Sequence, residues 1–387
     1  MPNFNQEITY LILFSAVLIL PKLMRRLRLP EGISCILLGL LSSYFWESFQ
    51  EDQLLLLLSR LGITSLFLFA GMEVDIKTLK THSNGLLKHL SVSLIMMGLC
   101  SAFLANIFHL PTQVAIIFSL GLLTPSTGFI LESIKDFRLS EGQKYWISSK
   151  SIAEEILAVM VLFIALQSND MQKLGMSLGV LIFLLLALPL IFKIFLKFVA
   201  PYAPKSEVAF LILLALICGV VTKKIGTYYL VGAFIVGIIA GRFKHFLGKV
   251  EGINIFNSLS IFFGIFIPFY FFKAGLSLSG NLFNKESLLI GIGFAIFIIP
   301  MRYSAVFYSQ KNFISDKVKR PWKVALSLMP TLIFGLVIAS ILRDRFEVKD
   351  SLIGGLFIYT LISSFLPAFA FERLPPKRYT SETVTND

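Results

Sequence analysis

Cysteine, histidine and charged side chains are all scarce in this chain of 387 residues. It has three cysteines and four histidines, and charged residues make up 15% of the sequence. Cys35, Cys100 and Cys218 fall in separate apolar segments, so we expect small core residues and neither a disulfide framework nor a metal site. We expect the histidines at helix ends near the membrane interface, without a catalytic role. They are His82, His89, His109 and His245.

Familiar signatures of hydrolases and of nucleic-acid binding are also missing. Neither Gly-x-Ser-x-Gly nor His-Glu-x-x-His occurs, so we expect no enzyme of these kinds and no cofactor. The net charge of +12 would suggest nucleic acid in a soluble protein. Here the cations fall in loops between apolar runs and are not interleaved with aromatic residues, so we expect no nucleic-acid partner.

Apolar residues dominate what is present. They make up 56% of the chain, the mean hydropathy is +0.80, and runs of about twenty apolar residues recur from end to end. This pattern predicts an all-α polytopic membrane protein. The first run, Ile8 to Leu20, has no small-residue cleavage site after it and precedes Arg25, Arg26 and Arg28, so we expect a transmembrane helix and not a signal peptide. We expect thirteen spans, at 8–24, 32–48, 54–74, 86–107, 112–134, 144–167, 173–200, 206–224, 228–243, 252–279, 285–308, 322–343 and 351–372, with 252–279 as one long piece or two.

Lysine and arginine are concentrated in alternate loops. The loops rich in these cations are 21–31, 75–89, 135–144, 192–206, 242–250 and 303–323. The loops 48–53 and 108–112 lack them, although Lys223, Lys224 and the segment 343–349 are exceptions. The positive-inside rule therefore predicts an external amino terminus and a cytoplasmic carboxyl terminus.

The chain contains an internal repeat. Phe69-Ala70-Gly71-Met72 matches Lys273-Ala274-Gly275-Leu276, and Thr124 to Gly128 matches Pro330 to Gly335, at an offset of roughly 205 residues in both cases. Seven spans separate the partners, an odd number, so the two halves should cross the membrane in opposite directions. The alternative is chance, because small residues and prolines are common in membrane helices.

Two spans should be interrupted near their middle. Proline removes a hydrogen-bond donor, and freed carbonyls at membrane depth are tolerated only where they line a cavity or a crossing. Paired interruptions in equivalent spans point to a transporter binding site, whereas either one alone would indicate an ordinary kink. The expected interruptions are Pro125 with Gly128 in one half, and Pro330 with Thr331 and Gly335 in the other.

Glu154 and Glu155 lie about ten residues into the span 144–167, roughly 15 Å deep at 1.5 Å per residue. Carboxylates at that depth are costly and mark a functional site by default. The two side chains diverge by ~100° on a helix, so they face different points. We expect Lys150 to pair with Glu154 at i, i+4, which leaves Glu155 as the carrier. The alternative is a buried structural charge network.

Three further cations fall within spans. Arg302 could be a permanent partner for a carboxylate or for a helix end, or it could extend to the interface. Lys273 raises the same two options. For Arg60, near the outer third of its span, we expect the interface.

Several segments in order along the chain resemble a known family. Leu29-Pro30-Glu31-Gly32, Gly71-Met72-Glu73-Val74-Asp75 and Leu230-Val231-Gly232-Ala233-Phe234 are similar to conserved segments of the monovalent cation:proton antiporter superfamily. The closest branch is that of bacterial sodium/proton antiporters and Kef-type potassium efflux proteins. That branch carries an aspartate-containing pair where Glu154-Glu155 stands, after an interrupted helix that matches Thr124 to Gly128.

The resemblance implies a function for this pair. It makes Glu155 the carboxylate that binds cation and proton, Glu154 the neighbour whose identity varies, and Arg302 the basic partner of the acidic site. We expect the hydroxyls of Thr124, Ser126 and Thr127 to help Glu155 bind a monovalent cation. A glutamate pair reaches ~1.5 Å further than an aspartate pair, which bears on cation choice. The Kef-type nucleotide-binding domain is not expected.

The resemblance also implies an architecture and a mechanism. We expect a sodium/proton antiporter-like fold that works as a homodimer in the bacterial inner membrane and exchanges Na⁺, or alternatively K⁺ or Li⁺, for H⁺ by alternating access. Competing interpretations are an ion-coupled symporter on the same fold and a potassium channel-like protein. The expected divisions are scaffold helices 1–84 and 206–284, core helices 85–168 and 285–373, a linker helix 169–205 and a cytoplasmic tail 374–387.

Overall fold

The computed structural model is helical throughout most of the chain. It describes residues 2–24, 29–45, 49, 51–74, 82–135, 137–168, 170–203, 206–225, 229–243, 258–259, 261–278, 282, 284–313 and 318–371. Arg25, Arg26, Arg28, Asp75, His245 and the tail 374–387 lie outside these described residues.

The helices divide into two sets separated by one long helix. The first set is α1 Pro2–Met24, α2 Glu31–Phe45, α3 Gln53–Met72, α5 Ser83–Phe108, α6 Thr112–Leu123, α7 Thr127–Ile134 and α8 Glu141–Gln167. The long helix is α9 Met171–Ile194, which continues into the π-helix η3 Phe195–Val199. The second set is α10 Glu207–Lys224, α11 Tyr229–Phe243, α13 Ile267–Leu276, α14 Lys285–Asn312, α15 Pro321–Ser327, α16 Leu332–Phe346 and α17 Asp350–Ala370.

These helices confirm the expected membrane architecture. Among the described residues, eight helical segments are long and apolar enough to cross a bilayer, with the pairs α6–α7 and α15–α16 counting as one segment each, and four more are apolar but shorter. Helix α8 is long but carries Lys150, Glu154 and Glu155 in its middle. Within the expected span 252–279, residues 261–264 are helical, a turn follows at 265–266, and α13 begins at Ile267. This span is therefore in pieces.

The packing of the helices confirms the inverted repeat. Taken in order, α1, α2, α3, α5, α6, α7 and α8 correspond to α10, α11, α13, α14, α15, α16 and α17. Many contacts between helices then have an equivalent. Helix α11 packs on α3 as α2 packs on α13, α5 packs on α6 as α14 packs on α15, and α7 packs on α8 as α16 packs on α17. The two halves thus repeat one arrangement of helices.

Two equivalent crossings depend on glycine. A Cβ on Gly275 of α13 would lie 2.1 Å from the carbonyl oxygen of Ile36 in α2, and a Cβ on Gly71 of α3 would lie 2.2 Å from that of Phe234 in α11. Neither distance is tolerable, so the backbones of each pair of helices touch directly. Close contacts of this kind through small residues are a main source of helix association in membranes.

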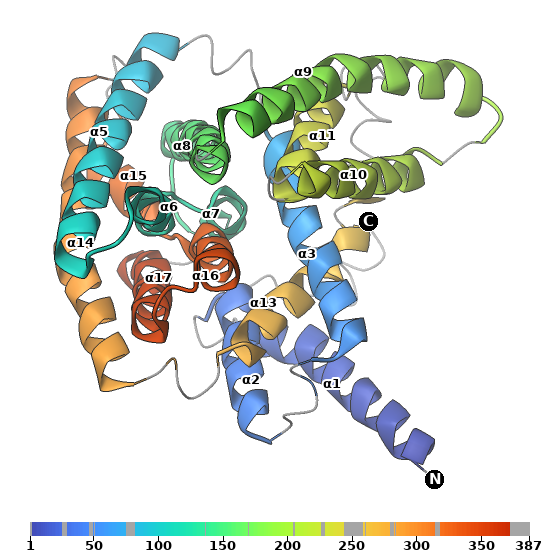
Figure 1. Ribbon diagram of the computed structural model, residues 1–387, viewed down its shortest axis with the longest axis horizontal. Helices are drawn as coiled ribbons and strands as arrows, with labels where there is room; N and C mark the ends of the chain where they lie inside the picture. Colours follow the sequence, from blue (N-terminus) through green and yellow to red (C-terminus); the bar gives the residue numbers. More distant parts are fainter. Residues whose placement is uncertain are drawn as a thin grey trace.

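The helices pack in two groups, which Figure 1 shows on opposite sides of the molecule. Helices α5 to α8 and α14 to α17 pack on one another, and α1 to α3, α10, α11 and α13 form the other group. Helix α9 contacts both groups, packing on α8, α10 and α11, and α3 contacts α7 directly. The roles expected for these groups, a moving core and a dimerising scaffold, stay predictions.

The start of α8 is held in place by its cap. Ser140 accepts a hydrogen bond from the backbone N–H of Gln143 and the Gln143 side chain accepts one from the N–H of Ser140, which forms a capping box. The same Gln143 side chain donates to the carbonyl of Lys319, 2.8 Å away. These contacts fix the depth at which α8 presents its two glutamates.

Candidate functional site

The two interrupted helices cross and bond to each other at their interruptions. Helix α6 ends at Leu123 and α7 begins at Thr127, while α15 ends at Ser327 and α16 begins at Leu332. The backbone N–H of Ser126 donates to the carbonyl of Pro330 at 2.8 Å. The expected breaks at Pro125 and at Pro330-Thr331 are confirmed.

Ser126 closes the amino-terminal end of the opposite half-helix. Its Oγ accepts hydrogen bonds from the backbone N–H groups of Ile333, at 2.8 Å, and Phe334, at 3.1 Å. A hydroxyl oxygen has two lone pairs, and both are used here. The expectation that Ser126 helps bind a cation is therefore wrong for this arrangement: its oxygen satisfies the free N–H groups of α16 instead.

The two glycines assigned to the breaks lie beyond them. Gly128 is the second residue of α7 and Gly335 is the fourth residue of α16. A Cβ on Gly335 would lie 2.3 Å from the Thr360 hydroxyl, so this glycine allows α16 to approach α17 closely. Gly128 has room for a Cβ, with its nearest neighbour 3.5 Å away. Neither glycine interrupts its helix.

Arg302 binds the carboxyl-terminal end of a half-helix. Its guanidinium donates to the carbonyls of Leu328 and Met329 just after α15, both at 2.9 Å, and to the Tyr359 hydroxyl at 3.2 Å. The Tyr359 hydroxyl in turn donates to the carbonyl of Leu122 near the end of α6, at 2.7 Å.

Helix carboxyl termini carry partial negative charge, so this buried cation is matched by the ends of α15 and α6. Arg302 is only 2% exposed. The helix-end option is thus confirmed for Arg302, and its extension to the interface is wrong.

Glu155 faces the interruption of the first crossing helix. Its carboxylate is buried and interacts with the hydroxyl and the backbone N–H of Thr127, the first residue of α7. Among the described residues, Glu155 Oε2 and the hydroxyl oxygens of Thr127 and Thr124 make no hydrogen bond of good geometry. A buried polar atom without a protein partner is rare and calls for a ligand, an ion or water.

These oxygens suit a hard monovalent cation as substrate. Such ions prefer carboxylate, hydroxyl and carbonyl oxygens over nitrogen or sulfur. Glu155 supplies the negative charge, and Thr124 and Thr127 supply neutral oxygens on either side of Pro125. Of the three hydroxyls expected near Glu155, these two have an oxygen to offer.

Glu154 is held on a different side of α8. Its Oε1 lies 2.9 Å from His89 Nε2 and accepts a hydrogen bond of 2.6 Å from the Ser93 hydroxyl, both on α5. Lys150 does not pair with it as expected: its ammonium donates to Ser309 Oγ on α14, at 3.2 Å. The same Ser309 oxygen lies 2.9 Å from His89 Nδ1.

The position expected for His89 is also wrong. The side chain is 1% exposed and lies inside the bundle, not at the interface. His89 and Ser93 are four residues apart and share one face of α5, and this spacing was the available sign of a polar site. Ser309 and Tyr359 carried no such sign, because their partners lie far away in the sequence.

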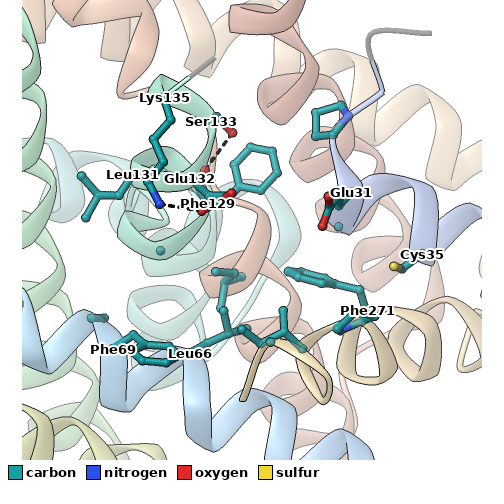
Figure 2. A pocket seen from close by; sticks show the side chains of 18 of the residues that line it. Glu31, Cys35, Leu66, Phe69, Phe129, Leu131, Glu132, Ser133, Lys135 and Phe271 are labelled. Atoms are coloured by element: carbon teal, nitrogen blue, oxygen red, sulfur yellow. Dashed lines mark hydrogen bonds and ion pairs between the residues drawn. The ribbon is translucent and has the colours of Figure 1, made fainter. Parts of the chain in front are cut away.

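An acidic cavity of about 490 Å³ reaches the crossing from one side. Figure 2 shows Glu31, Glu132 and Lys135 around it, with Leu66, Phe129 and Phe271 in its walls. Glu73 also lines this cavity and interacts electrostatically with Glu155. Lys135 forms an ion pair of 2.9 Å with Glu132. An excess of carboxylates in a cavity concentrates cations there.

The cavity ends beside the candidate site. Gly128, next to Thr127 on α7, and Ile333, whose N–H binds Ser126, both line it. Ions that enter among the carboxylates therefore arrive within one residue of the interruption that Glu155 faces.

A second cavity of about 650 Å³ lies on the other half of the same helices. It is lined by residues of α3 nearer its start, of α16 nearer its end, and of α13. Its cations are Arg60, Lys273, Arg343 and Arg345. Lys273 interacts electrostatically with Glu51 and Asp52 at the start of α3. The option that Lys273 pairs with the acidic site stays a prediction.

Comparison with known proteins supports the same fold. The family model described as "Sodium/hydrogen exchanger, transmembrane" matches residues 12–373. A probable Na⁺/H⁺ antiporter 3 of Methanocaldococcus jannaschii is 26% identical, over 92% of this chain and 91% of its own length. A Na⁺/H⁺ antiporter of Enterococcus hirae is 23% identical, over 92% of this chain and 94% of its own.

Solved structures give the same result. The sodium proton antiporter MjNhaP1 of Methanocaldococcus jannaschii at pH 8 superimposes with a TM-score of 0.67 at 15% identity, covering 94% of this chain and 96% of that one. Together with two crossing interrupted helices and an inverted repeat, the match over residues 12–373 shows that this chain belongs to the transmembrane sodium/hydrogen exchanger family, a family of transporters and not of enzymes.

Proposed function

We propose that this protein exchanges Na⁺ for H⁺ across the membrane, with Glu155 binding the two ions in turn. The observation that carries the proposal is the buried carboxylate of Glu155 beside the interruption at Thr127, with one oxygen that has no partner among the described residues. The two relatives described above, Na⁺/H⁺ antiporters of an archaeon and a bacterium, support sodium over K⁺ or Li⁺.

Competition at one carboxylate couples the two fluxes. A bare carboxylate inside the bundle is costly, so Glu155 carries either a proton or a cation whenever the site is closed to water. The Thr127 and Thr124 hydroxyls complete the shell of the cation. Binding of one ion requires the release of the other, which gives exchange and not leak.

Access alternates between the two cavities. Both are lined by α3 and α16, one near Leu66 and Ile333 and the other near Arg60 and Leu336. Movement of α5–α8 and α14–α17 against the remaining helices would open one cavity to Glu155 as it closes the other. With an external amino terminus, the acidic cavity faces the cytoplasm.

We also propose that the protein is a homodimer in the inner membrane.

The test is proton flux in proteoliposomes on addition of NaCl. We expect the wild-type protein to move protons and Glu155→Gln to move none, since an amide neither titrates nor carries charge. Glu132→Gln is the matched control, because Glu132 already pairs with Lys135 at the exposed rim of the cavity; it should retain exchange. Sodium-dependent proton movement in folded Glu155→Gln protein would contradict the proposal.

A further inference from the structure

Beside the candidate site lies a continuous chain of buried polar groups that ion binding at Glu155 does not use. It runs from Glu154 to His89, from His89 to Ser309 and from Ser309 to Lys150, with distances of 2.9, 2.9 and 3.2 Å between successive polar atoms. All four residues are buried, and they come from three helices, α5, α8 and α14. Four titratable or hydroxyl groups in one unbroken line within a membrane bundle are costly to bury unless they serve a function.

The contacts determine how protons are arranged along the chain. His89 Nε2 lies 2.9 Å from a carboxylate oxygen of Glu154, within ion-pair distance, although it makes no hydrogen bond of good geometry among the described residues. A carboxylate oxygen only accepts, so a proton on Nε2 suits this contact. Ser309 Oγ accepts from the Lys150 ammonium, which leaves its own hydroxyl proton free to point at His89 Nδ1. Each donor in the line therefore lies within 3.2 Å of an acceptor, and His89 is neutral when its proton is on Nε2.

Such a line can transfer a proton from one end to the other. Lys150 gives a proton to Ser309 Oγ, Ser309 gives its own proton to His89 Nδ1, and the proton on His89 Nε2 passes to Glu154 Oε1. Lys150 becomes a neutral amine and Glu154 a neutral carboxylic acid, while Ser309 and His89 each gain one proton and lose one. Lys150 then takes up a proton from water, so the four groups together hold one more proton than before. The reverse transfer releases that proton.

We expect water to reach the relay at its Lys150 end. Gln310, the residue after Ser309, is buried, and neither polar atom of its amide has a partner among the described residues. Buried amides in this condition are normally satisfied by ordered water. Ser309 and Gln310 fall in the last turn of α14, and His89 lies in the second turn of α5, so this region is close to one end of the bundle.

We propose that Glu154, His89, Ser309 and Lys150 form a second proton-binding site, separate from Glu155, so that the transporter exchanges two protons for each sodium ion. The inference rests on the proposed function, because it concerns how many protons accompany the exchange at Glu155. The neighbouring glutamates then have distinct tasks: Glu155 exchanges ions, and Glu154 accepts the proton that the relay delivers.

The test is the reversal point of exchange in proteoliposomes clamped at zero membrane potential. Net flux through a two-for-one exchanger stops when the logarithm of the proton ratio across the membrane is half the logarithm of the sodium ratio. Net flux through a one-for-one exchanger stops when the two logarithms are equal. We expect the wild type to reverse when the proton value is half the sodium value. Ser309→Ala cuts the relay, and His89→Gln can still hydrogen-bond to Glu154 but cannot carry a proton through its side chain, so both variants should reverse at equal gradients. Ser91→Ala removes an exposed hydroxyl on the same helix as His89 and should behave as the wild type.

Reversal of the wild type at equal gradients would overturn the inference, and so would an unchanged reversal point in Ser309→Ala or His89→Gln. Folded variants without any exchange would overturn it too, because one-for-one exchange at Glu155 should survive the loss of the relay. Absence of sodium-driven proton flux in the wild type would instead reject the proposed function itself.

Discussion

At the residue scale, adjacent side chains of α8 have separate partners because successive residues of a helix point ~100° apart. Glu154 is bound by His89 and Ser93 of α5. Glu155 faces Thr127 of α7, and one of its oxygens has no partner in the part of the chain that the structure describes. The difference between the two glutamates therefore lies in which helix each one meets.

Thr127 and Ser126 are neighbours with different tasks, and substitutions should separate them. Ser126→Ala leaves the buried N–H groups of Ile333 and Phe334 without their acceptor. Each unsatisfied buried group costs about 1–3 kcal/mol. We expect a lower unfolding temperature in detergent with sodium affinity retained.

Thr127→Val is the matched substitution, because it removes a hydroxyl that makes no hydrogen bond of good geometry among the described residues. We expect sodium affinity to fall while the unfolding temperature changes little. Thermal unfolding and sodium titration of both variants check the pair. The opposite pattern, with Ser126→Ala weakening binding and Thr127→Val destabilising, would contradict these assignments.

The sequence predicted the residues of the site better than their partners. Glu155, Thr124 and Thr127 could be chosen because a buried charge and a broken helix are both visible along one chain segment. The partners of Glu154, Lys150 and Arg302 could not, because His89, Ser309 and Tyr359 meet them from other helices. The i, i+4 spacing of Lys150 and Glu154 favoured a local pair, and tertiary packing gave Lys150 a different partner on α14.

At the element scale, the breaks were predictable because proline and hydroxyl residues act locally. Pro125 and Pro330 fall between half-helices as expected. The glycines were less predictable. In the sequence, Gly128 and Gly335 lie so close to the prolines that we assigned them to the breaks. A glycine that permits close helix packing cannot be distinguished in a sequence from one that interrupts a helix. Only the neighbouring helix distinguishes the two, as Thr360 does for Gly335.

The two glycine crossings should respond alike to an added methyl group. Gly275→Ala and Gly71→Ala each place a Cβ within 2.2 Å of a carbonyl oxygen on the partner helix. The backbones must separate, and overpacking of this kind costs typically 1–3 kcal/mol. We expect both variants to unfold at lower temperature by similar amounts, because the crossings are equivalent in the repeat.

Gly293→Ala on α14 is the control for these two variants. A Cβ there meets no atom of a described residue within 4 Å, and alanine favours helix over glycine by up to about 1 kcal/mol. Its unfolding temperature should stay the same or rise. Equal losses of stability in all three variants would show that close crossing is not the cause.

At the scale of the whole molecule, the two cavities differ in charge. The one beside Gly128 is lined by Glu31, Glu73 and Glu132, and the one beside Leu336 is lined by four cations. Cations therefore gather on the acidic side and are repelled on the other. The fold brings the acidic cavity to the crossing, where the helix ends and Glu155 meet.

Proton release tests most directly whether one carboxylate, that of Glu155, binds either sodium or a proton. Purified protein in detergent and weak buffer, near neutral pH, is mixed with NaCl while the pH is recorded. We expect the wild type to release protons as sodium binds and Glu155→Gln to release none. Proton release of wild-type size from folded Glu155→Gln protein would contradict the account.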